Sequence, residues 1–102
     1  HMQKRLKACD MRGFLSFLIL WLLSKEPMTG TELADEIGER KGCRPNPGTI
    51  YPALKELVHK KAIEVQSRSG KMKTYAITNS GKQELGGAVN LFCKTFYDVF
   101  TQ

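Results

Sequence analysis

The sequence has few of the residues that build metal centres and disulfide frameworks. Its 102 residues include three cysteines and two histidines, namely Cys9, Cys43, Cys93, His1 and His59. The cysteines lie far apart with no CxxC pair, and no group of Cys and His has the spacing of a zinc site. We therefore expect no metal, a reducing setting such as the cytoplasm, and cysteines that remain ordinary thiols.

The sequence motifs of enzymes are also missing. There is no P-loop, no GxGxxG stretch and no pair of carboxylates in a context that forms a pocket. The spacing places no serine or cysteine beside His59 as a nucleophile. We expect no catalytic residues and no cofactor. One alternative is a redox sensor built on Cys43, which precedes the cationic Arg44.

Apolar runs are too short for a membrane span. The run Phe14–Leu23 has ten residues, and Ser16 interrupts it. Since a membrane-spanning helix needs about 20 apolar residues, the run predicts a buried core helix and no membrane partner. Hydrophobic residues make up 41% of the chain and charged residues 25%, as in a folded soluble domain.

Positive charge is present in excess and unevenly distributed. Sixteen Lys and Arg against ten Asp and Glu give a net charge of +6. Residues 1–13 carry +3, residues 14–45 carry −1, residues 46–78 carry +4, and residues 79–102 are neutral. A small basic domain favours an anionic partner, with plain solubility as the alternative.

The first two predicted helices precede the basic segment. The first runs from about Met11 to Ser24 and is apolar nearly all round, so covering it calls for a second subunit. A capping box of Thr29 and Glu32 predicts the start of the second helix, and Gly42 its end. The second helix is acidic, and its carboxylates must point away from any phosphate; they are Glu32, Asp35, Glu36 and Glu39.

The third predicted helix follows a turn-rich loop and runs to about Lys61. Its start is ambiguous. With Asn46 as N-cap, Pro52 costs a backbone hydrogen bond and kinks the helix, whereas with Thr49 as N-cap Pro52 falls in the first turn. We favour an irregular first turn. The spacing of four apolar residues predicts one buried face; they are Ile50, Leu54, Leu57 and Val58.

A two-stranded hairpin and a last helix complete the chain. Apolar and polar residues alternate on both sides of Ser69-Gly70-Lys71, which predicts the hairpin. The last helix starts near Thr78 or Ser80, and Gly86-Gly87 interrupt it. Its apolar residues are spaced four, three, four and three apart, as in a helix–helix seam. The alternative is a stripe that packs on its own domain.

This order of elements predicts a mainly α fold with a small antiparallel β-hairpin (α+β). It is the order of a winged helix-turn-helix followed by a C-terminal dimerisation helix. We expect an N-terminal segment at residues 1–10 that includes an expression-tag scar, His1-Met2. The winged helix-turn-helix then spans residues 11–78 and the C-terminal helix residues 79–102.

Four blocks of sequence resemble the PadR-type transcriptional regulators, in the small branch with one C-terminal helix. They are Gly13–Leu23, Pro27–Leu33, Pro47–Leu57 and Tyr75–Gly81. The resemblance implies a cytoplasmic, repressor-like homodimer whose third helix and wing touch DNA and whose last helix pairs the subunits. Thr31 departs from the family, which usually has an aromatic residue at that position.

The expected partner is therefore double-stranded DNA, bound at a pseudo-palindromic operator. The third helix would approach the bases and the cationic wing the phosphates. The expected DNA-binding residues are Asn46, Gly48, Thr49, Tyr51, Lys55, Arg68, Lys71 and Lys73. Tyr51 is equally well explained by packing under the wing, and Asn46 or Thr49 by capping. The different-class alternative is a winged-helix interaction module that does not bind DNA.

The other expected partner is a second copy of the chain. The expected dimer-interface residues come from the first and last helices and are Phe14, Phe17, Trp21, Leu85, Val89, Phe92, Phe96 and Val99. The last helix has no tryptophan, and its phenyl rings are expected to fill the seam. The sequence therefore allows a small-molecule effector but predicts a closed interface without a drug-sized cavity.

Overall fold

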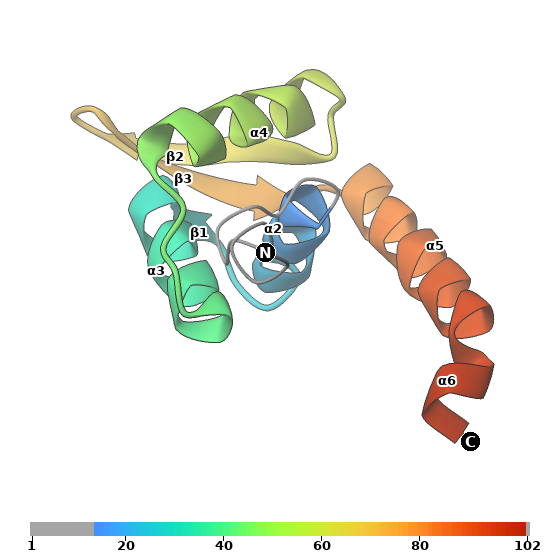
Figure 1. The fold of residues 1–102 in the computed structure, drawn as a ribbon. Coiled ribbons are helices and arrows are strands. Elements are labelled where there is room, and N and C mark those ends of the chain that lie inside the picture. Colours follow the sequence, from blue (N-terminus) through green and yellow to red (C-terminus); the bar gives the residue numbers. More distant parts are fainter. Residues whose placement is uncertain (1–13, 102) are drawn as a thin grey trace.

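The computed structural model describes residues 14–101, with side chains as far as Val99. The predicted N-terminal segment, the helix start at Met11 and Cys9 lie outside the described residues. The elements in chain order (Figure 1) are α2 (Leu15–Leu23), β1 (Met28–Thr29), α3 (Gly30–Lys41), α4 (Pro47–His59), β2 (Ile63–Ser69), β3 (Met72–Ile77), α5 (Asn79–Thr95) and α6 (Tyr97–Thr101).

The predicted mainly α winged helix is confirmed, with one more strand than expected. The hairpin of β2 and β3 forms, and β1 adds to the other side of β3 to give the antiparallel order β1-β3-β2. Met28 pairs with Tyr75 and Ile63 with Ile77. At two residues, β1 is too short to show period-two alternation, so the sequence pattern could not reveal it.

The core lies where α2, α3, α4 and the sheet meet. Ile19 of α2, Leu33 and Ile37 of α3, and Ile50 of α4 are almost completely buried. The predicted core role of α2 is confirmed, because five of its nine residues are buried. Among the described residues, no helix combines the length and apolarity needed to cross a membrane.

The predicted start and end of α3 are both confirmed. The Thr29 backbone amide donates to Oε1 of Glu32 at 2.9 Å, and the Glu32 amide donates to Oγ1 of Thr29 at 3.1 Å. This reciprocal capping box satisfies amides that lack partners within the helix. The helix ends at Gly42, whose φ of 79° is left-handed and therefore suits glycine.

The preference for an irregular first turn in α4 was wrong. The helix begins at Pro47, with Asn46 in the N-cap position, and Pro52 lies inside it. The amides of Thr49 and Ile50 donate to the Asn46 carbonyl at 2.9 and 3.1 Å. Pro47 fits the first helical position because its amide would have no partner there in any case.

The turn that ends α4 is a Schellman motif with lysine in the left-handed position. The Ala62 amide donates to the Leu57 carbonyl and the Lys61 amide to the Val58 carbonyl, both at 2.9 Å. Lys61 has a φ of 65°, the only positive φ of a non-glycine residue in the described chain. This conformation is strained for a side chain with a Cβ.

The last helix breaks at a different place from the one predicted. α5 runs through Gly86 and Gly87 without interruption, and the break comes at Phe96, between α5 and α6. No atom comes within 4 Å of a Cβ built on either glycine, so neither glycine marks a close approach in the single chain. Interior glycines lower helix propensity but do not by themselves break a helix.

Replacing Lys61 by glycine should stabilise the fold. The variant Lys61→Gly removes left-handed strain of about 1–2 kcal/mol and adds a smaller entropic cost, so we expect a gain of about 0.5–1 kcal/mol. The measurement is thermal unfolding. Lys55→Gly, within α4, is the control and should lower the stability by about 1 kcal/mol. Equal losses in both variants would contradict the assignment of strain to Lys61.

Candidate functional site

The start of α4 presents an exposed group of small polar residues. The Thr49 hydroxyl lies 3.2 Å from Oδ1 of Asn46 and donates to it. The Asn46 side chain makes no hydrogen bond to a helix amide, although Asn46 occupies the N-cap position. A Cβ on Gly48 would lie 3.3 Å from the same Oδ1. The predicted residues Asn46, Gly48 and Thr49 therefore lie together, and the side chains of Asn46 and Thr49 are hydrogen-bonded to each other.

Tyr51 lies between the start of α3 and the wing. A Cβ built on Gly30 would come within 2.7 Å of the Tyr51 ring, so glycine is needed for the ring to sit there. The ring packs in this position while 44% of the residue stays exposed. Tyr51 is therefore both a packing residue and available at the surface, as its two predicted roles require.

A hollow of about 230 Å³ separates Tyr51 from the wing. Three predicted site residues line it, namely Tyr51, Lys71 and Lys73. The other lining residues were not predicted; they are Thr29, Gly30 and Thr31 at the start of α3, and Met72 and Tyr75 on the wing. The capping box at Thr29 located the helix start, but nothing in the sequence showed that it faces the wing.

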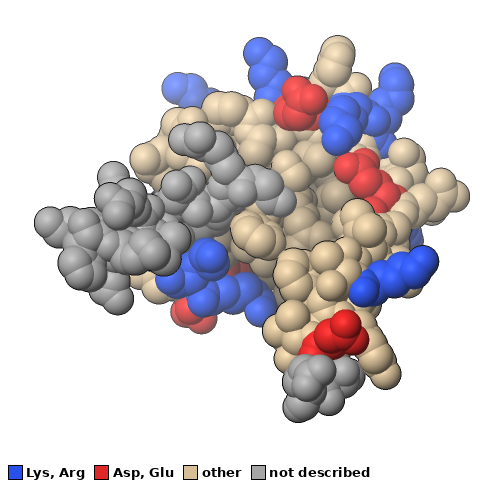
Figure 2. Space-filling view, turned by 45° about the vertical axis from the view of Figure 1, so that its right-hand side comes forward, with Lys and Arg blue, Asp and Glu red and all other residues tan. Residues whose placement is uncertain are grey.

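The predicted cations of α4 and the wing are exposed. They are Lys55, Arg68, Lys71 and Lys73. In the described part of the chain, none of these four forms an ion pair, whereas Lys60 pairs with Glu84 at 3.2 Å and Arg44 with Asp35 at 2.6 Å. Figure 2 shows blue side chains along the upper edge of the molecule, where α4 lies. These four charges are available to an anion.

The acidic residues of α3 line a different hollow. Glu32, Asp35 and Glu36 surround a depression of about 290 Å³ together with Glu26, Pro27 and Met28. None of these six residues lines the hollow beside Tyr51. The acidic hollow and the hollow beside Tyr51 therefore have different linings, although Glu32 of the first is hydrogen-bonded to Thr29 of the second.

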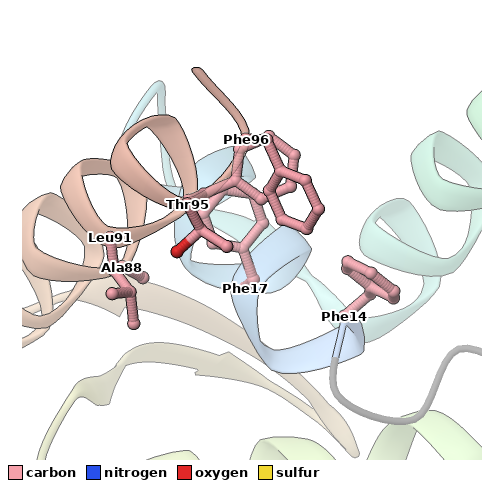
Figure 3. A pocket seen from close by; sticks show the side chains of 7 residues that line it. Phe14, Phe17, Ala88, Leu91, Thr95 and Phe96 are labelled. Atoms are coloured by element: carbon pink, nitrogen blue, oxygen red, sulfur yellow. The ribbon is translucent and has the colours of Figure 1, made fainter. Parts of the chain in front are cut away.

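A second surface, here named the phenylalanine groove, lies between α2 and α5. It has a volume of about 360 Å³ and is lined by Phe14, Phe17, Ala88, Leu91, Phe92, Thr95 and Phe96. Figure 3 shows aromatic side chains from both helices around it. The rings of Phe92 and Phe96 have centroids 4.7 Å apart, and 43% and 39% of these residues are exposed. Ala88, Leu91 and Thr95 lie off the predicted stripe.

The remaining predicted interface residues differ in their surroundings. Leu85 is half-buried and packs on the core, as the own-domain alternative expected. Val89 and Val99 are exposed. Trp21 does not line the groove. Its ring centroid lies 4.6 Å from the Lys25 ammonium and 4.6 Å from the Arg40 guanidinium, so cation–π contacts occupy it.

The expectation that all cysteines are ordinary thiols was wrong at Cys43, which is disulfide-bonded. Spacing along the chain carries no information on which cysteines approach each other in the fold. Cys93 is an exposed free thiol on α5. Among the described residues, no three His, Cys, Asp or Glu side chains are grouped so that they could hold a metal ion.

Tyr75 should make the stability depend on pH above 10. Burial raises the pKa of Tyr75 above its ordinary value of 10.0, the neighbouring Tyr51 raises it further, and Arg68 partly opposes both. As the pH rises, the unfolded chain releases this proton first. The contribution of Tyr75 to the free energy of unfolding is therefore constant below pH 10 and falls above it.

The measurement is the urea midpoint from pH 8 to 11. Tyr75→Phe has no proton to release, so its midpoint should fall less steeply above pH 10 than that of the original chain. Tyr97→Phe, at an exposed position on α6, is the control and should follow the original chain. Identical curves for all three proteins would show that Tyr75 does not carry this pH dependence.

Solved proteins share this arrangement. RosR of H. salinarum is 28% identical with a TM-score of 0.74, and the match covers 88% of this chain and 81% of that one. A PadR-like transcription factor from Bacteroides fragilis is 25% identical with a TM-score of 0.76, and the match covers 85% of this chain and 87% of that one. PadR of Bacillus subtilis, solved with operator DNA, is 32% identical with a TM-score of 0.65, covering 74% and 47%.

None of the curated proteins matches the chain. The model of the transcriptional regulator PadR-like family matches residues 19–87, which is more than half of the chain. The matched residues run from α2 through the wing into α5, and they include both the start of α4 and the four exposed cations. The chain therefore belongs to the PadR-like family of transcriptional regulators.

Proposed function

We propose that this regulator binds a pseudo-palindromic DNA operator as a homodimer and acts as a repressor in the cytoplasm. The proposal rests on four exposed cations on α4 and the wing, none of them in an ion pair within the described chain. The solved complex of the related B. subtilis protein with operator DNA supports it. A repressor of this kind would act by occupying its operator and would need no catalytic residue.

The start of α4 is the part of the surface best suited to read bases. In helix-turn-helix proteins the N-terminal residues of the recognition helix enter the major groove. Asn46 and Thr49 stand at this end, and an asparagine amide can pair with an adenine edge in two hydrogen bonds. Their mutual hydrogen bond limits the orientations of both side chains before DNA arrives. This preorganisation lowers the entropic cost of binding.

The wing and the hollow beside Tyr51 are suited to phosphates. Lys71 and Lys73 line the hollow from the wing, and the Tyr51 ring borders it from α4. Lysines and tyrosine hydroxyls contact phosphate oxygens without reading sequence. Lys55, one turn after Tyr51, would extend the contact along the same backbone. These contacts would fix the position of α4 in the major groove of the DNA.

A second copy of the chain is the proposed occupant of the phenylalanine groove. No charged residue lines this groove. Burying one Phe contributes about 1.5–3 kcal/mol, and Phe14, Phe92 and Phe96 each leave 39% or more of their surface exposed in the single chain. A two-fold interface uses each such residue twice. The proposed interface therefore buries enough apolar surface for a stable dimer.

The same interface determines whether a small-molecule effector has room to bind between the subunits. We propose that α5 of the partner fills the phenylalanine groove, which leaves no cavity for a drug-sized molecule. In this arrangement residues 14–78 form the DNA-binding unit and residues 79–101 the dimerisation unit. Phe14 and Phe17 of α2 contribute to the seam, whereas Trp21, with its two cation contacts, lies away from the groove.

The second candidate function is a winged-helix module that binds a protein instead of DNA. The acidic hollow around Glu32, Asp35 and Glu36 favours this candidate, because it would suit a basic protein surface. Salt separates the two candidates. DNA binding through several phosphates weakens steeply as the salt concentration rises, because the release of counterions from the DNA is then less favourable.

Replacing Lys55 should weaken binding to all DNA sequences alike. Lys55→Gln removes one phosphate contact, so the slope of log affinity against log salt should fall by about one. Asn46→Ala should instead change the sequence preference. The measurement is competition binding, at several salt concentrations, to the genomic DNA upstream of the gene that encodes this protein.

Lys82→Gln is the matched control for Lys55→Gln, because it removes the same charge from an exposed position on α5. Its salt slope should equal that of the original chain. An affinity of the original chain that does not change between low and high salt would contradict DNA binding.

Adding charge to the phenylalanine groove should separate the subunits. Phe92→Asp with Phe96→Asp places two carboxylates in an apolar seam, where burial of unpaired charge is strongly unfavourable. We expect monomers or aggregates in analytical ultracentrifugation. Gln83→Asp with Asn90→Asp adds the same charges on the opposite face of α5 and should leave the dimer intact. A soluble dimer of the Phe92/Phe96 variant would place the interface elsewhere.

A further inference from the structure

The end of α4 and the start of α5 are joined by contacts that leave little freedom between them. The Thr78 hydroxyl donates to the Lys61 carbonyl at 2.6 Å and lies 3.0 Å from the Ala62 carbonyl. The Thr78 amide also donates to the Ala62 carbonyl at 3.0 Å. The same hydroxyl accepts the Gly81 amide and so caps α5. One residue thus binds the turn after α4 to the first turn of α5.

Two further contacts close this joint. A Cβ on Gly81 would lie 2.0 Å from the Ala62 carbonyl oxygen, so the backbones touch and only glycine fits. One turn further along α5, Glu84 accepts from Lys60 at 3.2 Å. The joint of Thr78, Gly81 and Glu84 against residues 60–62 therefore holds the first turn of α5 on the domain, and the packing of α5 on α2 beyond it also contributes to the direction of the helix.

That direction has a geometric consequence for the dimer. Phe92 lies eleven residues beyond Gly81, or about 16 Å at 1.5 Å per residue. Tilting α5 by about 10° at the joint moves the seam by about 3 Å, close to the rise of one base pair. If the seam is fixed by the partner, the same tilt moves α4 instead. A small change in the tilt of α5 at the joint therefore changes the distance between the two recognition helices of the dimer.

We propose that this joint determines the half-site spacing that the regulator accepts. Thr78 and Glu84 are positioning residues: they act through the direction of α5 and not through contact with DNA. The proposal rests on the dimeric DNA binding proposed above. One added base pair moves a half-site by about 3.4 Å and rotates it by about 35°, so a rigid joint should reject it.

The test compares operators that differ only in spacing. DNA selected by the original dimer from a random pool is resynthesised with one base pair added or removed between the half-sites. The original protein should bind the best spacing at least about tenfold more tightly than either neighbour. Thr78→Val with Glu84→Gln should reduce this ratio to about threefold or less while the protein remains a dimer in ultracentrifugation.

The controls separate spacing from charge and from folding. Glu64→Gln adds the same net charge at an exposed position on β2 and should keep the tenfold ratio. Thr78→Ser retains the hydroxyl and should also keep it. Should the double variant not fold, the exposed Glu84→Gln alone is measured, with an intermediate ratio expected.

Two results would overturn the proposal in distinguishable ways. An unchanged spacing ratio in a folded, dimeric Thr78/Glu84 variant would show that the joint contributes only to stability, and DNA binding itself would stand. Failure of the original protein to select any DNA would overturn the proposed function and this inference with it.

Discussion

The burial of one face of α4 is the constraint on which the rest of the surface depends. Ile50, Leu54 and Leu57 are each 1% exposed, packed against α2 and the sheet. Because side chains three and four apart share a helix face, this burial turns Thr49 and Lys55 outward. The same packing holds the turn after α4 against the start of α5. The cationic face and the joint are therefore consequences of one packed helix face.

Charge and apolar surface are separated on the molecule. The hollow beside Tyr51, which two wing lysines line, shares no residue with the acidic hollow of α3, and no charged residue lines the phenylalanine groove. Each surface suits a different partner: phosphate for the first, a second copy of the chain for the last. A domain of about 100 residues can serve both because its core occupies the middle of the winged helix and leaves α5 extended (Figure 1).

Local signals in the sequence predicted much of the fold. The capping box at Thr29, the stop at Gly42 and the alternation around Gly70 are each contained in a few neighbouring residues, and all three are confirmed. The errors concern features that depend on distant residues. β1 forms because Met28 pairs with Tyr75, which is distant in the sequence. α4 continues through Pro52 because its buried face packs on the core. The break at Phe96 has no glycine or proline signal.

The candidate site was predicted in part for the same reason. The helix pattern and the hairpin predicted which cations are exposed, but not that Gly30 makes room for the Tyr51 ring or that Trp21 is held by Lys25 and Arg40. Such contacts depend on the distance between elements, which no local pattern specifies. The stripe spacing likewise located Phe92 and Phe96 but missed Leu91, which lines the groove with them.

In the proposed complex, the start of α4 and the wing together form the DNA-binding surface. Hydrogen–deuterium exchange of the original protein with and without its selected operator is the direct test of this surface. We expect slower exchange on DNA binding at residues 46–55 and 66–73, with no change in the second half of α3. Slower exchange confined to α5 or to the acidic hollow, with the wing unchanged, would contradict it.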